Sequence, residues 1–231
     1  MSMRRFLRTL LAPVLLLAPL YGWDCGRTEK TAADETESVV ILRTNQGDIT
    51  LRFYPAAAPE HVKNFLAHSQ SGLYKGCLFH RVIPGFMIQG GDPNTKDGDP
   101  ANDGAGGYSY RGPGSRLTAE FNNRPHTRGT LAMARSDDPN SAGSQFFICQ
   151  SDAPFLDGKY TVFGEVIGGL DAVDRIAAAP CGDGNRPLED QRIEEVLIEK
   201  WPARRIEEAK AAMAAEAVGK DDPGASEDSV R

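Results

Sequence analysis

The chain contains few of the residues on which metal sites and nucleophilic active sites depend. Its 231 residues include four cysteines and four histidines, and their spacing matches neither a zinc site nor a C-x-x-C redox motif. Ser144 lies in the segment AGSQFF, which is not the G-x-S-x-G turn that exposes a nucleophilic serine. The sequence therefore argues against a zinc enzyme and against a hydrolase with a catalytic triad.

Two loop segments contain only fragments of ligand-binding motifs. Residues 92–103, DPNTKDGDPAND, resemble a calcium loop, but Lys96 stands where an oxygen ligand is needed and Gly98 is one position late. Residues 104–107, GAGG, lack the Lys-Ser/Thr and the helix that follow a phosphate loop. We therefore expect no metal and no cofactor, and a solvated loop whose glycines let the backbone pack closely or approach a ligand.

Basic residues form no cluster after the first residues, and the net charge is −6. This balance argues against nucleic acid as a partner. The 24 glycines and 15 prolines indicate many turns, as in a domain made mainly of β-strands.

Cys77 and Cys149 lie in apolar runs and are expected to be buried thiols, while a disulfide from either of them to Cys181 stays open.

The N-terminus has the pattern of an export segment. Three arginines within the first eight residues precede the apolar stretch 10–20, which is short for a membrane-spanning helix of roughly 20 residues. Residues 1–23 are therefore predicted to be a signal peptide or a retained N-terminal anchor. Cys25 offers a lipid-anchor alternative, although Asp24 stands where a small residue is expected. We expect export, to the periplasm or to a membrane anchorage facing the periplasm or the exterior.

After a polar linker, residues 24–36, the pattern predicts a single domain over residues 37–202. Period-two apolar runs separated by turn residues predict roughly eight strands, and a closed barrel would hide their edges. Two short helices are expected, one starting at Pro59 and ending at Gly72, and one over residues 169–179. Residues 203–231 are predicted to form a helix with a thin apolar stripe, which Gly219 ends, followed by a disordered polar tail.

One apolar segment, FHRVIPGFMIQGGD at residues 79–92, contains an arginine and an amide that a buried strand does not need. Arginine is rarely buried without a partner, so Arg81 is difficult to explain as a core residue. Because residues i and i+2 of a strand share a face, Met87 lies on the same face as Gln89, and Gln145 on that of Phe147. The alternative, in which the aromatic residues form the core and the polar residues its rim, leaves Arg81 unexplained. The candidate groove residues are Arg81, Phe86, Met87, Gln89, Met133, Ala134, Arg135, Gln145, Phe147, Phe155, Leu156 and Tyr160.

Four segments together resemble the cyclophilins, the barrel-shaped family of peptidyl-prolyl cis-trans isomerases. They are FHRVIPGFMIQGGD, GTLAMAR, NSAGSQFFI and FLDGKYTVFGEV, which occur in the family's order over about residues 38–200. The resemblance implies a mainly β fold, an eight-stranded antiparallel barrel with a helix capping each end. It also implies an enzyme that rotates X–Pro bonds in unfolded or flexible polypeptides, without a cofactor and as a monomer.

The resemblance also implies roles for individual residues. Arg81 corresponds to the family's catalytic arginine, and Gln89 to the amide that holds the substrate backbone. The proline pocket corresponds to Phe86, Met87, Phe147 and Leu156, and further groove positions to Ala134, Arg135 and Gln145. Phe155 and Tyr160 stand where eukaryotic members have tryptophan and histidine, as in bacterial members. Because Phe155 lacks an indole N–H, tight cyclosporin binding is not expected.

Two other functions remain open on the sequence. A barrel of this kind could bind proline-containing segments without turning them over, although the presence of Arg81 together with Gln89 favours the enzyme. The chain could also act as an adaptor through a helix at residues 203–218, although its apolar stripe is narrow.

Overall fold

In the computed structural model, residues 36–220 are described, with their side chains as far as residue 216. The predicted signal peptide or anchor, Cys25, most of the linker and the polar end after residue 220 lie outside the described residues. No helix within the described range is long and apolar enough to cross a membrane.

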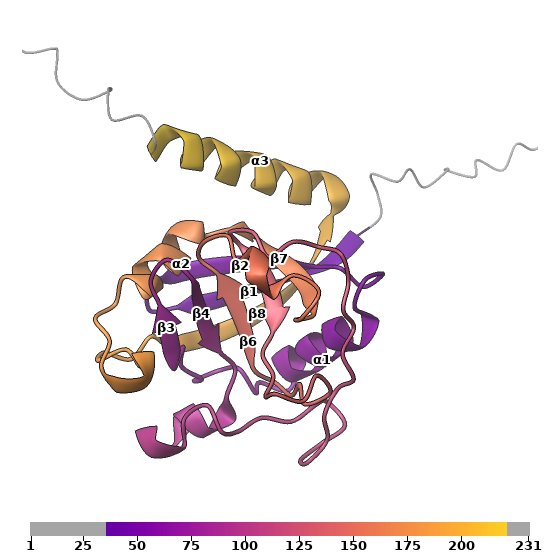
Figure 1. The fold of residues 1–231 in the computed structure, drawn as a ribbon. Helices are drawn as coiled ribbons and strands as arrows, with labels where there is room; N and C mark the ends of the chain where they lie inside the picture. Colours follow the sequence, from indigo (N-terminus) through magenta and orange to yellow (C-terminus); the bar gives the residue numbers. More distant parts are fainter. Residues whose placement is uncertain (1–35, 221–231) are drawn as a thin grey trace, which may run out of the picture. The chain divides into compact units, whose positions relative to one another are not determined.

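Eight strands form one antiparallel sheet, as the alternating apolar runs predict. They are β1 (Thr36–Thr44), β2 (Gly47–Phe53), β3 (Arg81–Ile83), β4 (Met87–Gly90), β5 (Thr130–Met133), β6 (Phe146–Cys149), β7 (Val162–Gly168) and β8 (Ile193–Pro202). Their order in the sheet is β3-β4-β6-β5-β7-β2-β1-β8, so the two outer strands are β3 and β8. The sheet curls strongly around its core, as Figure 1 shows.

The curled sheet is joined along its seam by residues just before β3 and residues at the start of β8. Phe79 N–H donates to the carbonyl of Gln191 at 2.8 Å, and Ile193 N–H donates to that of Cys77 at 2.9 Å. These bonds give partners to backbone groups that an open sheet edge would expose. The predicted barrel is therefore present as a half-barrel whose seam joins the chain just before β3 to the start of β8.

Two helices cover opposite sides of the curled sheet (Figure 1) and insert into the same core. Helix α1 (Pro59–Gln70) starts at the proline that the sequence indicated and buries Phe65. Helix α2 (Leu170–Ala177) buries Val173 and Ile176. Each helix places its apolar face toward the sheet, as the spacing of these residues requires.

A third helix, α3 (Ala203–Lys220), follows β8 directly and ends one residue beyond the predicted stop at Gly219. Its first turns pack on the sheet, because Ile206 is buried against Trp201 and Ile167. Lys210 pairs with Glu165 of β7 at 2.8 Å. The segment that the sequence predicted as a helix is thus attached to the domain by apolar contacts and by ion pairs, which include Glu207 with Arg52 of β2 at 3.3 Å.

The three cysteines within the described residues are free thiols. Burial raises the pKa of Cys77 to about 11 and that of Cys149 to about 12, so both stay protonated at neutral pH. The disulfide to Cys181 that the sequence left open is absent from this part of the chain.

Candidate active site

The register of the sheet explains why polar residues interrupt an apolar segment. Arg81 of β3 pairs with Gln89 of β4, and Gln89 pairs with Phe147 of β6. Directly paired residues point to the same face of an antiparallel sheet, so these three side chains form a row across it. Their neighbours Val82 and Ile88 face the opposite way and are fully buried in the core. Alternation therefore divides one apolar run between the core and an outer groove.

The groove has two adjoining sections. The first has a volume of about 290 Å³ and is lined by Arg81, Phe86, Met87, Gln89, Ala134, Arg135, Phe147, Phe155, Leu156 and Tyr160. The second, of about 240 Å³, shares Gln89, Ala134 and Arg135 with the first and adds Gln145. The structure thus brings together all the residues that the cyclophilin resemblance assigned to a site. Met133, which the sequence also proposed for the groove, lies in the core instead. Ala132 of β5 and Ala134, which follows it, occupy the side of the chain that faces the groove.

Arg81 is held by a row of neutral amides. Its Nη1 donates to Oε1 of Gln89 at 3.3 Å, and Nε2 of Gln89 donates to Oε1 of Gln145 at 2.9 Å. Nε2 of Gln145 in turn donates to the carbonyls of Gly104 and Gly106, at 2.9 and 2.8 Å. No carboxylate among residues 36–216 forms an ion pair with Arg81. Its positive charge is therefore oriented without being neutralised, which leaves it available to a ligand.

The loop that ends this row is tied down by a buried carboxylate. Asp92 is fully buried, and its two oxygens accept from the N–H groups of Asn94 and Gly106, at 2.8 and 3.0 Å. A Cβ at Gly106 would collide with the Asp92 carboxylate, so a larger residue would displace the loop. The glycines of residues 104–107 thus allow a close backbone approach, and two of their carbonyls fix Gln145.

The opposite side of the groove is an apolar pocket with an exposed rim. Met87, Phe147 and Leu156 are buried and line it. Phe155 is 60% exposed and packs against Phe86 at the rim, with ring centroids 5.4 Å apart. A small apolar ring would find a preformed hydrophobic surface here, with the Arg81 guanidinium at its edge.

Arg135 is engaged by backbone carbonyls. Its Nε and Nη2 donate to the carbonyl of Lys159, at 3.2 and 3.0 Å, and its guanidinium lies 4.4 Å from the ring centroid of Tyr160. Arg135 therefore joins the chain just after β5 to the segment that follows Phe155 and Leu156.

Several residues of the second section were not singled out from the sequence. They include Arg116, Ser136 and Ser141, which line it beside the glycines of residues 104–107. For Arg116 the indication available was the length of the loop over residues 92–116, because a long irregular loop in a compact domain is often functional. No group of three or more potential metal ligands occurs among the described residues.

Comparison with known proteins agrees with this geometry. Residues 39–198 match the family model described as cyclophilin type peptidyl-prolyl cis-trans isomerase/CLD. The chain is 45% identical over 175 residues to a probable peptidyl-prolyl cis-trans isomerase of Brucella abortus, covering 74% of this chain and 85% of that protein. It is 42% identical over 163 residues to peptidyl-prolyl cis-trans isomerase CYP18-1 of Arabidopsis thaliana, covering 71% and 97% of the two chains.

Solved structures show the same relationship. A cyclophilin type peptidyl-prolyl cis-trans isomerase of Cryptosporidium parvum is similar with a TM-score of 0.65 and 35% identity, covering 72% of this chain and 99% of that one. A structure of that protein determined in the presence of the dipeptide Ala-Pro has a TM-score of 0.64. The fold and the activity implied by the sequence are thus confirmed, and the chain belongs to the cyclophilin-type peptidyl-prolyl cis-trans isomerases.

Proposed function

We propose that this isomerase rotates X–Pro bonds in the groove beside Arg81, with Arg81 as its catalytic residue. The observation that carries the proposal is an arginine with no carboxylate partner among the described residues, held by Gln89 at the edge of an apolar pocket. The substrate-binding residues proposed are Phe86, Met87, Gln89, Ala134, Arg135, Gln145, Phe147, Phe155, Leu156 and Tyr160.

The reaction breaks no covalent bond. Amide resonance gives the X–Pro bond a rotational barrier of about 18–20 kcal/mol, which holds the uncatalysed step to tens or hundreds of seconds. When the amide twists, resonance is lost and the proline nitrogen regains its lone pair. A cationic N–H donor, acting on that nitrogen or on the preceding carbonyl oxygen, binds the twisted state more strongly than the planar one, which lowers the barrier.

The apolar pocket supplies the second requirement, which is a fixed point for the rotation. A proline ring seated on Phe147, Met87 and Leu156 is held while the chain on the other side of the bond turns. The neutral partner of Arg81 contributes to the rate, because a carboxylate in place of Gln89 would compete with the substrate for the positive charge.

We propose as substrates proline-containing segments of unfolded or flexible polypeptides in the compartment to which the protein is exported. The related Cryptosporidium parvum structure determined in the presence of Ala-Pro supports a proline-containing ligand. The basic and apolar N-terminal sequence supports export, to the periplasm or to a membrane anchor. We also propose that the protein is a monomer. Mass spectrometry of the mature N-terminus in membrane and soluble fractions tests this location.

The catalytic assignment is tested by Arg81→Ala in a protease-coupled assay on an Xaa-Pro peptide. Loss of one charged donor to the transition state is expected to lower kcat about 10² to 10³-fold. The variant should remain folded, because Arg81 is not a core residue. Activity within threefold of the parent would exclude Arg81 as the catalytic residue. Peptide binding by the parent chain without acceleration would make the groove a binding module.

A further inference from the structure

One buried histidine holds both ends of the turn that forms the outer wall of the pocket. The N–H and the ring Nδ1 of His126 each lie 2.8 Å from Oδ1 of Asp157, so Nδ1 carries a proton and donates it. The carbonyl of His126 accepts from Ala153 N–H at 2.7 Å. Between these two anchors lies a short 3-10 turn, Pro154–Leu156, which carries the pocket residues Phe155 and Leu156.

The same histidine supports the other wall of the pocket from behind. Its ring stacks on Phe147 of β6, with centroids 6.1 Å apart and an angle of 13° between the planes. His126 is 1% exposed and does not line either section of the groove. His126 therefore fixes the turn that carries Leu156, through its bond to Asp157, relative to strand β6, through its contact with Phe147.

We propose that His126 is a positioning residue that sets the spacing between Phe147 and the turn carrying Leu156, and thereby how tightly the proline ring is held. This inference rests on the proposed use of the groove as the proline site. The role is geometric, because bond rotation moves no proton and His126 is separated from the groove by Phe147. The expected consequence of its loss is weaker substrate binding with little change in the rate at saturation.

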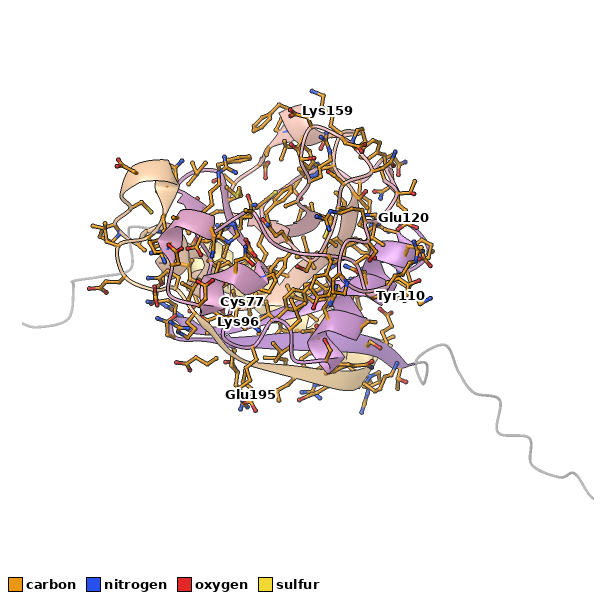
Figure 2. The ribbon with its side chains drawn as sticks, turned by 90° about the horizontal axis from the view of Figure 1, so that it is seen from below. Cys77, Lys96, Tyr110, Glu120, Lys159 and Glu195 are labelled. Carbon is orange, nitrogen blue, oxygen red and sulfur yellow. The ribbon has the colours of Figure 1, made fainter. Side chains whose placement is uncertain are left out.

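The chain contains a second clamp of the same construction, which supplies a matched control. His61 is also 1% exposed, and its N–H and Nδ1 lie 3.0 and 2.6 Å from Oε2 of Glu120. Its ring lies beside the core residue Phe163 instead of a pocket wall. Figure 2 shows Glu120 beside α1, well separated from Lys159, which follows the pocket turn. Losing this clamp should cost stability without altering the pocket.

The experiment compares His126→Phe, His126→Asn, Asp157→Ala and His61→Phe. Phenylalanine keeps a ring against Phe147 but removes the hydrogen bond, whereas asparagine places an N–H donor near the position of Nδ1. Dissociation constants for an Ala-Pro-containing tetrapeptide are measured by NMR titration, kcat by exchange of the same peptide, and stability by urea unfolding.

We expect His126→Phe to raise Kd about threefold to tenfold, the equivalent of one lost hydrogen bond, with kcat within twofold of the parent. His126→Asn should recover part of this loss. Asp157→Ala should reproduce the rise in a chain that folds normally, because the Asp157 side chain is 41% exposed. His61→Phe should lower the urea midpoint and leave Kd within twofold.

The inference is overturned if Kd changes by less than twofold in both His126→Phe and Asp157→Ala. It is also overturned if His61→Phe raises Kd as much as His126→Phe, which would assign the effect to general loosening, or if asparagine restores nothing. Failure of the catalytic proposal looks different, because it appears as full activity in Arg81→Ala whatever the His126 variants show.

Discussion

The two sides of the groove are built on different kinds of structure. Arg81 and Gln89 stand on hydrogen-bonded strands, where the sheet register sets the direction of each side chain. Phe155 and Leu156 stand on a single turn, which side chains such as His126 fasten to the sheet. The side that supplies a directed charge therefore rests on the more rigid support, and the side that closes over a variable polypeptide rests on a turn.

This difference predicts that the two sides affect different kinetic constants. Changes to the strand-borne polar row should lower the rate of the bound substrate, because the row orients a donor toward the twisted amide. Changes to the pocket should weaken binding, because the pocket grips the proline ring in the planar and twisted states alike.

After Arg81→Ala, the largest effect is expected when a carboxylate is placed beside the charge of Arg81. In the parent chain, Nη1 of Arg81 lies 3.3 Å from the amide oxygen of Gln89, so Gln89→Glu places a carboxylate beside the guanidinium. This variant should lower kcat about 100-fold and leave Kd within threefold. Gln89→Met is the control, since it removes the hydrogen bond without adding charge, and should lower kcat about tenfold at most. Equal losses in the two variants would show that orientation, not charge, matters.

A smaller effect is expected from Phe147→Ala, measured by NMR titration with an Xaa-Pro peptide. Removing a wall that is 5% exposed should weaken binding by about 1.5–3 kcal/mol, or roughly 10 to 100-fold in Kd. Phe147→Leu, which keeps most of the apolar surface, should lose less. An unchanged Kd for Phe147→Ala would remove this residue from the substrate pocket.

Acid should weaken the fold, because buried histidines are held in their neutral forms. Burial lowers the pKa of His61, His68 and His80 below 6.5, so the folded state favours their neutral forms. The unfolded chain then binds more protons, and stability falls as the pH drops from about 6.5 toward these lowered values. The urea midpoint should therefore be lower at pH 5.5 than at pH 7.5. Activity of the folded enzyme should stay nearly level above pH 6, because catalysis by an arginine needs no change of protonation in this range. A midpoint that rose on acidification would contradict this.

The smallest effect on activity is expected from deletion of residues 203–231. The deletion removes the buried side chain of Ile206 and should lower the free energy of unfolding by about 2–3 kcal/mol. It also removes the ion pair between Lys210 and Glu165, which lies outside both groove sections. Activity on an Xaa-Pro peptide should stay within twofold of the parent, and a larger loss would connect α3 to the site.

Most of the strands could be predicted because each is a local pattern. The break at Pro84-Gly85 separates β3 from β4 as expected, and the alternation within FHRVIPGFMIQGGD already places Met87 and Gln89 on one face. Met133 shows where local patterns fail. Its strand is buried on both faces, so the contrast between a core face and an exposed face is weak there.

The sequence by itself determined the eight strands, the two covering helices, the residues that the family uses in its groove, and the absence of any nucleophile motif. Tertiary structure alone decided that Arg81 is held by neutral amides ending on the carbonyls of Gly104 and Gly106. It also decided that His126 rather than His61 stands behind the pocket. Both facts depend on pairings between segments far apart in the chain. Such contacts are set by register and packing, which the local order of residues does not encode.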